Sequence, residues 1–327
     1  MIWLAIMKRG ELSDSSFKDI CYDGCHRYDR QIILPELGDD GQALLAAARV
    51  LVVGAGGLGS PVALYLAAAG VGTIGLVDFD TVGWSNLNRQ ILYCESDIGL
   101  SKVSVAAQRL RKLNSSINVV EHFGKLSSCD EVKVAVQTHL PETLCSGEES
   151  ERKSSGNTRC LDVWRLVKDY DIVIDACDNL ATRHLVGKVT AELGIPYIFG
   201  AIDGFCGQLS VFNYGEGAQR KRFSDLWPDD LPSYEPVLPP EESESSAPET
   251  TTIAMANEHT EPTDMAVAAE HTEPTDMAVA AVGVTAGVIG SLQASEAIKI
   301  ICGFGDVLAG QLLTVDLRTL EIHKLTL

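Results

Sequence analysis

A run of apolar residues that ends in a glycine-rich turn constrains the fold of this chain more than any other feature. Residues 50–53 have the composition of a buried parallel strand. Three glycines follow with the spacing of a turn into a helix: Gly54, Gly56 and Gly59. The N–H groups at such a helix start bind anions, so this pattern predicts a nucleotide phosphate as ligand. Asp78 follows a second predicted strand (73–77), at the position where a carboxylate meets a ribose hydroxyl.

Charged residues further along the chain favour ATP over NAD as that nucleotide. A hydride-transfer enzyme reacts at the nicotinamide, several bonds away from the phosphates. An enzyme that breaks a phosphoanhydride must instead stabilise charge that develops on phosphate oxygens, which Arg, Lys and a divalent metal do. The chain supplies the cations as Arg30, Arg89 and Lys102 and a metal ligand as Asp178, which follows a later predicted strand. We therefore expect ATP with Mg²⁺.

Strand and helix patterns alternate along the chain, which predicts an α/β fold with a Rossmann-like, doubly wound sheet. The expected helices are 41–49, 58–69, 102–113, 161–168, 179–193 and 284–302. The expected strands are 50–53, 73–77, 117–121, 172–175, 197–201, 207–213, 311–315 and 321–325. The sheet is expected to be mostly parallel. Partial alternation in 207–213 indicates antiparallel strands at the C-terminal side.

Two segments interrupt this alternation. Residues 127–160 are polar and largely aperiodic, which predicts a surface insertion. A mobile crossover loop is predicted over residues 217–281, because residues 217–265 are rich in Pro, Glu, Ser and Thr. Within this loop, residues 258–269 are repeated without change as 270–281. Two copies of so short a unit are too few for a solenoid, so the repeat indicates a segment that tolerates duplication.

Composition and charge narrow the class of protein. The 327 residues are 46% hydrophobic, enough for one domain over 27–327 behind an N-terminal extension of 1–26. A net charge of −19 disfavours binding to nucleic acid or to an anionic membrane. The sequence has no apolar run near the ~20 residues of a membrane helix. We expect no secretory signal, because the first apolar run is too short and its charges follow it. Nine irregularly spaced cysteines predict reduced thiols in the cytoplasm, and either Met1 or Met7 is compatible with the true start.

Six motifs occur in a fixed order, and together they resemble the ThiF/MoeB/HesA family, relatives of the ubiquitin-activating enzymes. The motifs are Arg27-Tyr28-Asp29-Arg30-Gln31-Ile32, the glycine turn, Asp78-Phe79-Asp80, Asn86-Leu87-Asn88-Arg89-Gln90, Lys102, and Asp178-Asn179 with Arg183. The resemblance covers roughly 27–126, 162–216 and 282–327. It implies adenylation of the C-terminal glycine of a small ubiquitin-like sulfur carrier, with release of pyrophosphate.

The resemblance also implies roles for individual residues. The residues implied to bind the nucleotide are Gly54, Gly56, Gly57, Gly59, Asp78, Asp80, Asn86, Arg89 and Lys102. The catalytic residues would be Arg30, Arg89, Lys102 and Asp178. Asp178 would hold Mg²⁺, and Arg30 would reach into the neighbouring protomer of a homodimer. Simpler alternatives are surface ion pairs for Arg30 and Arg89 and a helix cap for Asp178, while Arg183 either pairs with Asp178 or touches ligand.

Two features that many family members share are missing here. There are no paired Cys-x-x-Cys motifs, and Cys21, Cys25 and His26 have no second pair, so we predict no zinc site. No cysteine lies between Cys206 and Cys302, so the crossover loop offers no thiol for a thioester or persulfide. The resemblance then implies a separate sulfurtransferase.

The predicted function is therefore that of an ATP-dependent nucleotidyltransferase, a sulfur-carrier protein adenylyltransferase. Its partner would end in Gly-Gly and would serve thiamine, molybdopterin or another sulfur product. The alternatives are adenylation of a peptide or another carboxylate, and an inactive nucleotide-binding partner subunit. A nicotinamide oxidoreductase ranks last, because it has no need for the clustered cations.

Overall fold

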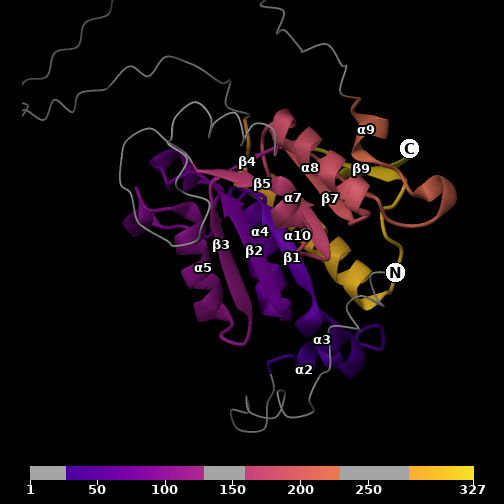
Figure 1. Cartoon of the computed structure of the whole chain (residues 1–327), viewed down its shortest axis with the longest axis horizontal. Helices are drawn as coiled ribbons and strands as arrows, with labels where there is room; N and C mark the ends of the chain where they lie inside the picture. The colour runs from indigo at the N-terminus through magenta and orange to yellow at the C-terminus, as the bar shows by residue number, and fades with distance from the viewer. Residues whose placement is uncertain (1–26, 129–158, 229–279) are drawn as a thin grey trace, which may run out of the picture. The chain divides into compact units, whose positions relative to one another are not determined.

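The computed structural model describes residues 27–128, 159–228 and 280–327, all of which belong to one compact unit (Figure 1). The duplicated segment and the Cys21–His26 cluster lie outside these residues, as do most of the predicted insertion and most of the predicted crossover loop.

One eight-stranded sheet organises the unit. The strands stand in the order β10-β9-β8-β7-β6-β1-β2-β3. Strands β7, β6, β1, β2 and β3 are parallel, and β8, β9 and β10 continue the sheet antiparallel. The bounds are β1 Arg49–Val53, β2 Thr73–Asp78, β3 Asn118–Phe123, β6 Ile172–Asp175, β7 Tyr197–Asp203, β8 Cys206–Phe212, β9 Gln311–Asp316 and β10 Glu321–Thr326. This confirms the predicted fold class, including the antiparallel C-terminal side.

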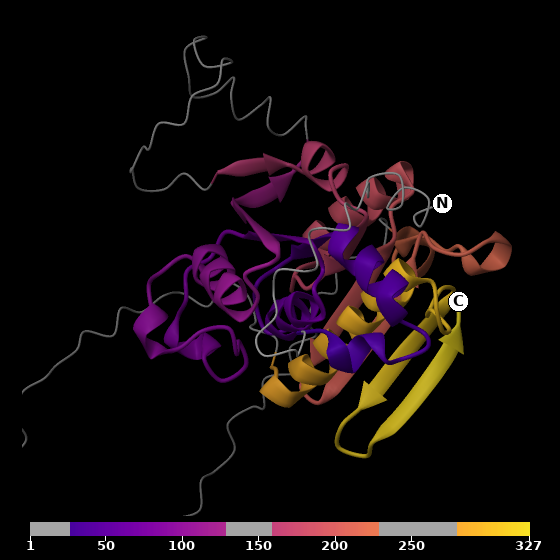
Figure 2. The same cartoon turned by 90° about the horizontal axis from the view of Figure 1, so that it is seen from below.

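Helices cover both faces of the sheet (Figures 1 and 2). The first face carries α3 (Gly38–Ala47), α4 (Gly59–Ala69), α5 (Lys102–Leu113) and α10 (Gly283–Cys302). The second face carries α7 (Val163–Val167), α8 (Leu180–Leu193) and α9 (Phe223–Leu226). Successive residues of β1 alternate between the two hydrophobic clusters, with Val50 and Val52 in the first and Leu51 and Val53 in the second.

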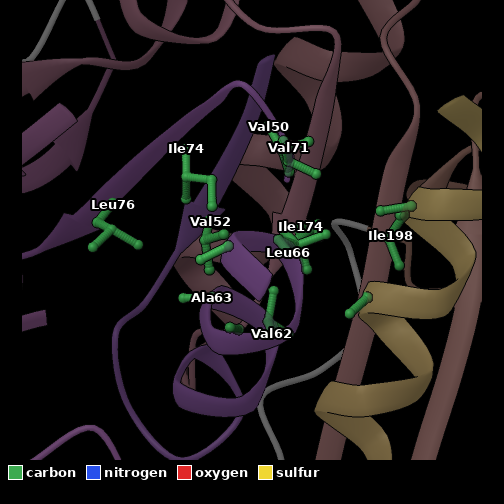
Figure 3. Close-up of a cluster of buried hydrophobic side chains, with 14 of the residues drawn as sticks. Val50, Val52, Val62, Ala63, Leu66, Val71, Ile74, Leu76, Ile174 and Ile198 are labelled. Carbon is green, nitrogen blue, oxygen red and sulfur yellow. The ribbon is translucent and has the colours of Figure 1, made fainter. Parts of the chain in front are cut away.

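The first cluster is built around α4, as Figure 3 shows. Val62, Ala63 and Leu66 of this helix lie against Val50 and Val52 of β1. Ile74, Leu76, Ile174 and Ile198 extend the cluster onto β2, β6 and β7. The small residues of α4 allow close packing, which fixes the start of the helix relative to the end of β1. Those two ends are joined by the glycine turn.

Helix α10 is long and apolar enough to span a membrane by length and composition, unlike what the sequence led us to expect. In the described fold, however, 56% of its most apolar 18-residue window is buried. It packs against α3, α4, β7 and β8, and Gly290 allows the close approach to Pro61 of α4. This is the environment of a core helix.

Several predicted boundaries differ from the structure. The helix predicted over 41–49 ends at Ala47, because the Arg49 backbone joins β1, where its N–H donates to Asp171 at 2.9 Å. The helix predicted from residue 161 begins at Val163, after a short strand β5 (Cys160–Asp162) that pairs with β4 (Lys125–Ser127). The two strands bring together the ends of the predicted insertion.

The first residues of the predicted crossover loop are ordered secondary structure instead. A 3₁₀ turn, η3, spans Gly217–Gln219, and α9 follows it. Phe223 of α9 is buried among Tyr197, Phe199 and Phe212 of β7 and β8. Burial of one aromatic ring holds this segment on the sheet, a long-range contact that local composition does not reveal.

Candidate active site

The candidate site lies where the strand order reverses. From β1 the chain proceeds to β2 and β3 on one side, and it later crosses to β6 and β7 on the other. The carboxyl ends of β1 and β6 are therefore neighbours, with Val53 opposite Asp175. Ligands of doubly wound sheets bind in the crevice outside this point. The predicted nucleotide-binding residues lie at the carboxyl ends of β1 and β2 or on the segments that follow them, and Asp178 follows β6, whereas Arg30 precedes β1.

The glycine turn presents N–H groups at the start of α4 that no described residue accepts. No acceptor among the described residues receives the N–H of Gly56, Gly57 or Leu58. These groups lie at the positive end of the α4 dipole, which attracts anions. A Cβ on Gly56 would have nothing closer than the Gln90 amide nitrogen at 3.6 Å, so this part of the turn is open toward ligand.

Asp78 fastens the end of β2 to this turn. One carboxylate oxygen accepts the N–H of Ala55 at 2.8 Å, and the other accepts the N–H of Asp80 at 2.8 Å. Burial raises the pKa of the Asp78 carboxyl above its ordinary value, and the ammonium of Lys102 works against that shift. Each carboxylate oxygen keeps a further lone pair, so a hydroxyl donor such as that of ribose fits the predicted role.

Lys102 is the first residue of α5, and its side chain is 6% exposed. Its ammonium lies 2.8 Å from the Asp80 carboxylate, whose side chain is 49% exposed. The backbone N–H of Lys102 also donates to the carbonyl of Asp80 at 3.0 Å. An ammonium at a helix start opposes the helix dipole, so the Asp80 carboxylate is needed to hold it there. The structure thus brings Asp78, Asp80 and Lys102 together beside the glycine turn.

Arg89 lies beside Gly57 of the glycine turn. A Cβ on Gly57 would lie 3.5 Å from the Arg89 side chain and 3.3 Å from Ala286 of α10. The guanidinium donates to the carbonyl of Ser85 at 2.7 Å and to the Asn88 side chain at 3.1 Å. Arg89 forms no ion pair with an acid among the described residues.

Asn86 has a structural role in this segment. Its side-chain oxygen accepts the N–H of Gly83 at 3.0 Å and closes the 3₁₀ turn η1 (Trp84–Asn86). This turn carries the carbonyl of Ser85 that holds the Arg89 guanidinium. Whether the Asn86 side chain also lines the nucleotide pocket stays a prediction.

Asp178 is exposed beyond the carboxyl end of β6 and has no hydrogen bond or ion pair with a described residue. Helix α8 is capped by Asn179, whose side chain accepts the N–H of Thr182 at 2.9 Å. The helix-cap alternative for Asp178 is therefore wrong. An uncommitted carboxylate here fits Mg²⁺, which takes one or two protein carboxylates plus substrate phosphates. No group of three or more metal-ligating side chains occurs in the described ranges.

Arg183 pairs with Asp175 rather than with Asp178, which corrects the first of its two predicted alternatives. Its guanidinium lies 3.4 Å from the buried Asp175 carboxylate and donates to the Cys177 carbonyl at 2.8 Å. The same carboxylate accepts from the Tyr197 hydroxyl at 2.7 Å. Burial and the Asp175 charge raise the pKa of the Cys177 thiol, so it stays protonated. This network fixes the loop that carries Asp178.

Arg30 lies far from the glycine turn of its own chain. It belongs to α2 (Asp29–Ile32), where the neighbouring Gln31 donates to the carbonyl of Ala69 at 3.1 Å. Ala69 ends α4, and the turn stands at the other end of this 11-residue helix, about 15 Å away. Arg30 is exposed and forms no ion pair with another described residue.

Sequence reasoning missed two residues that shape the site. The Tyr93 hydroxyl donates to the carbonyl of Ala55 in the glycine turn at 2.7 Å. Asp175 organises the loop after β6 through the contacts described above. An acidic residue that ends a buried strand is a usable signal for Asp175. A lone tyrosine three residues after the Asn-Leu-Asn-Arg-Gln motif carries no such signal.

Comparison with known proteins identifies the family of this chain. The model of the ThiF family matches residues 28–327. A Zea mays protein named adenylyltransferase and sulfurtransferase MOCS3-2 is 35% identical over 93% of this chain and 48% of its own length. A Thermus thermophilus protein named sulfur carrier protein adenylyltransferase is 34% identical over 92% of this chain and 86% of its own length. The chain thus spans about half the length of the maize relative.

Solved structures share the fold. A crystal structure of PaaA superimposes with a TM-score of 0.62 at 20% identity, over 99% of this chain and 80% of that one. A crystal structure of Escherichia coli MccB with ATP superimposes with a TM-score of 0.60 at 19% identity, over 92% of this chain and 71% of that one.

Proposed function

Because this chain belongs to the ThiF family, we propose that it is an ATP-dependent adenylyltransferase for the C-terminal glycine of a ubiquitin-like sulfur-carrier protein. The observation that carries the proposal is the buried Lys102 ammonium beside Asp78 and the unpaired N–H groups of the glycine turn. A hydride-transfer site has no need for a buried cation here. The name of the T. thermophilus relative, which this chain matches over most of its length, supports a sulfur carrier as the substrate.

The reaction requires positioning and charge neutralisation. A terminal carboxylate oxygen attacks the α-phosphorus of ATP, a new P–O bond forms, and the bond from the α-phosphorus to the bridging oxygen breaks. Pyrophosphate leaves with the electron pair. The attacking carboxylate is already an anion, so no general base is needed. The N–H groups of Gly56 and Gly57 orient the phosphates, and Lys102 and Arg89 stabilise the charge that develops on the leaving group.

The remaining residues serve binding. Asp78 orients the ribose, and Asp178 would hold Mg²⁺. When bound, the metal would neutralise charge on the phosphate oxygens. Sulfur would then be added by a separate sulfurtransferase, since no cysteine lies between Cys206 and Cys302. Cys206 itself is exposed at the start of β8, and Cys177 is held as a thiol.

Mass spectrometry tests the proposal directly. Incubation with a Gly-Gly-ending carrier, ATP and Mg²⁺ should yield a carrier heavier by one AMP, together with pyrophosphate. A carrier that lacks its last glycine is the matched control and should gain no mass. Pyrophosphate exchange that depends on a small carboxylate, without any carrier adduct, would select the alternative substrate class. ATP binding without exchange for any carboxylate would select the inactive partner subunit.

We further propose a homodimer in which Arg30 completes the site of the neighbouring protomer. The distance between α2 and the glycine turn of the same chain supports this proposal, because one side chain cannot span α4. Arg30→Ala and Lys102→Met should each be inactive alone. An equimolar mixture, allowed to exchange subunits, should recover about a quarter of wild-type turnover, because half of the dimers are mixed and each has one intact site of two.

Subunit exchange must be shown independently, for example by two affinity tags that co-purify from the mixture. Exchanged dimers that stay inactive would contradict the assignment of Arg30 to the neighbour's site. Full activity of Arg30→Ala alone would contradict any catalytic role.

A further inference from the structure

We propose that Tyr93 is a positioning residue of the adenylation site, which orients the glycine turn and holds it to the helix that carries Lys102. The inference rests on the proposed function for its catalytic consequence. The buried Tyr93 hydroxyl makes two contacts, and both can be tested without measuring turnover.

The first contact determines where a phosphate-binding N–H group points. The Tyr93 hydroxyl donates to the carbonyl oxygen of Ala55 at 2.7 Å. In a trans peptide the N–H of the following residue points away from that carbonyl, so the bond fixes the direction of the Gly56 N–H. That N–H has no acceptor among the described residues, and a Cβ on Gly56 would have no neighbour closer than 3.6 Å.

The two peptides that flank Ala55 are thus held by different side chains. Asp78 accepts the Ala55 N–H at 2.8 Å, and Tyr93 holds the Ala55 carbonyl. Asp78 alone leaves the peptide between Ala55 and Gly56 able to rotate, because its bond fixes only the preceding peptide. Tyr93 removes this freedom, which matters at a turn that must present its N–H groups to an anion.

The second contact connects this turn to the catalytic lysine. The same hydroxyl shares its proton with the carbonyl of Lys102 at 3.3 Å. The Lys102 backbone N–H donates to Asp80, and its ammonium contacts the Asp80 carboxylate. The start of α5 is therefore anchored at Asp80 and at Tyr93. One hydroxyl keeps the first residue of α5 at a fixed distance from the glycine turn.

The tyrosine is suited to this role by its surroundings. Its ring is buried in the cluster around α4, so the hydroxyl position is set by packing rather than by solvent. Burial and the charge of Asp78 raise the pKa of the hydroxyl, so it keeps the proton that it donates. Phenylalanine would retain the packing and lose only the two contacts.

Tyr93→Phe separates positioning from packing. We expect kcat for AMP transfer to fall about tenfold, because misplaced N–H and ammonium groups weaken transition-state stabilisation. The KM for ATP should change by less than about threefold, since Asp78 and the turn glycines remain. The midpoint of thermal unfolding should fall by no more than about 5 °C.

Tyr170→Phe is the matched control. Tyr170 is also a buried tyrosine, and its hydroxyl bonds His122 at 2.7 Å in the cluster on the other face of the sheet. This variant should lower the thermal midpoint by a similar amount and leave kcat unchanged. Equal kcat losses in both variants would show that Tyr93 serves only packing and would overturn the proposal. A Tyr93→Phe protein that is unfolded would overturn it as well.

Hydrogen exchange tests the geometry without turnover. The N–H groups of Ala55 and Lys102, which donate to Asp78 and Asp80, should exchange about tenfold faster in Tyr93→Phe than in wild type. They should be unchanged in Tyr170→Phe. Unchanged exchange at both positions would overturn the proposal. If wild-type protein transfers no AMP to any carrier, the proposed function fails, and this measurement alone decides the role of Tyr93.

Discussion

Replacing Lys102 with methionine is expected to lower the rate of AMP transfer by about 100- to 1,000-fold. The buried ammonium lies beside Asp78 and the glycine turn, and in the proposed reaction charge on the leaving pyrophosphate develops at this place. A preorganised charge in such a place is worth this much in other enzymes, because it needs no reorganisation during the reaction. The loss should be mainly in kcat, since the interaction strengthens in the transition state.

The variant should nevertheless fold. Methionine retains much of the buried aliphatic volume of lysine, and Asp80, half exposed, can return to solvent.

The substitution should also change how the stability of the fold depends on pH. The Lys102 charge lowers the pKa of the Asp78 carboxyl, which burial has raised, so its removal raises that pKa further. When the pKa of an aspartate is higher in the folded state than in the unfolded state, protonation stabilises the fold. This stabilisation is complete at a pH below the unfolded-state pKa, and it is lost as the pH rises through the folded-state pKa. Relative to wild type, Lys102→Met should therefore be least stable at neutral pH.

Lys112→Met provides the control on the same helix. Lys112 is exposed in the last turn of α5, far from the glycine turn, so this variant should keep wild-type kcat. Single-turnover AMP transfer and thermal unfolding between pH 4 and pH 8 measure both effects. If Lys102→Met transfers AMP at the wild-type rate, Lys102 does not stabilise charge on the leaving group, and its proposed catalytic role is wrong.

The main-chain architecture follows closely from sequence. The apolar run before Gly54 and the alternation of strand and helix patterns predict β1, the turn and the first crossover helix, and the structure has them as β1 and α4. These features are local, so hydrophobic periodicity is sufficient to detect them. The α9 segment was missed because it depends on Phe223 finding an aromatic pocket formed by β7 and β8, which are distant in sequence.

The sequence predicted most of the residues that lie at the site, but it did not predict which of them contact one another. Motif order brings Asp78 and Lys102 to the same crevice, yet it does not show that Asp80 holds the Lys102 ammonium. Likewise, Arg183 was placed near Asp178 from spacing, whereas the buried Asp175 attracts it more strongly. Pairings of this kind depend on burial, which follows from the assembled fold.

Alanine at Gly56 and alanine at Gly59 are expected to abolish ATP binding for different reasons. At Gly59 a Cβ would lie 2.0 Å from the carbonyl oxygen of Gly54, so the turn cannot form without a backbone shift. We expect Gly59→Ala to lose about 3 kcal/mol of stability or more, which lowers the thermal midpoint by about 6–12 °C. At Gly56 a Cβ has no neighbour closer than 3.6 Å, so the unliganded protein should be as stable as wild type.

The difference appears only when nucleotide is added. A ligand that binds the folded state raises the thermal midpoint, so ATP with Mg²⁺ should stabilise the wild-type protein. In the proposed site the backbone at Gly56 approaches the phosphates closely, and a methyl group there would occupy that space. Gly56→Ala should therefore keep its midpoint without ATP and lose the shift with ATP. Gly59→Ala should show a lower midpoint under both conditions.

A third glycine controls for the substitution itself. Gly287 lies within α10, and a Cβ there meets no atom within 4 Å. Gly287→Ala should stabilise the fold by up to about 1 kcal/mol through helix propensity and keep the full ATP shift. If Gly56→Ala retains the ATP shift of the wild type, the phosphates do not lie against this turn. The assignment of Gly56, Lys102 and Arg89 to the phosphates would then be wrong, even though the family and the fold would stand.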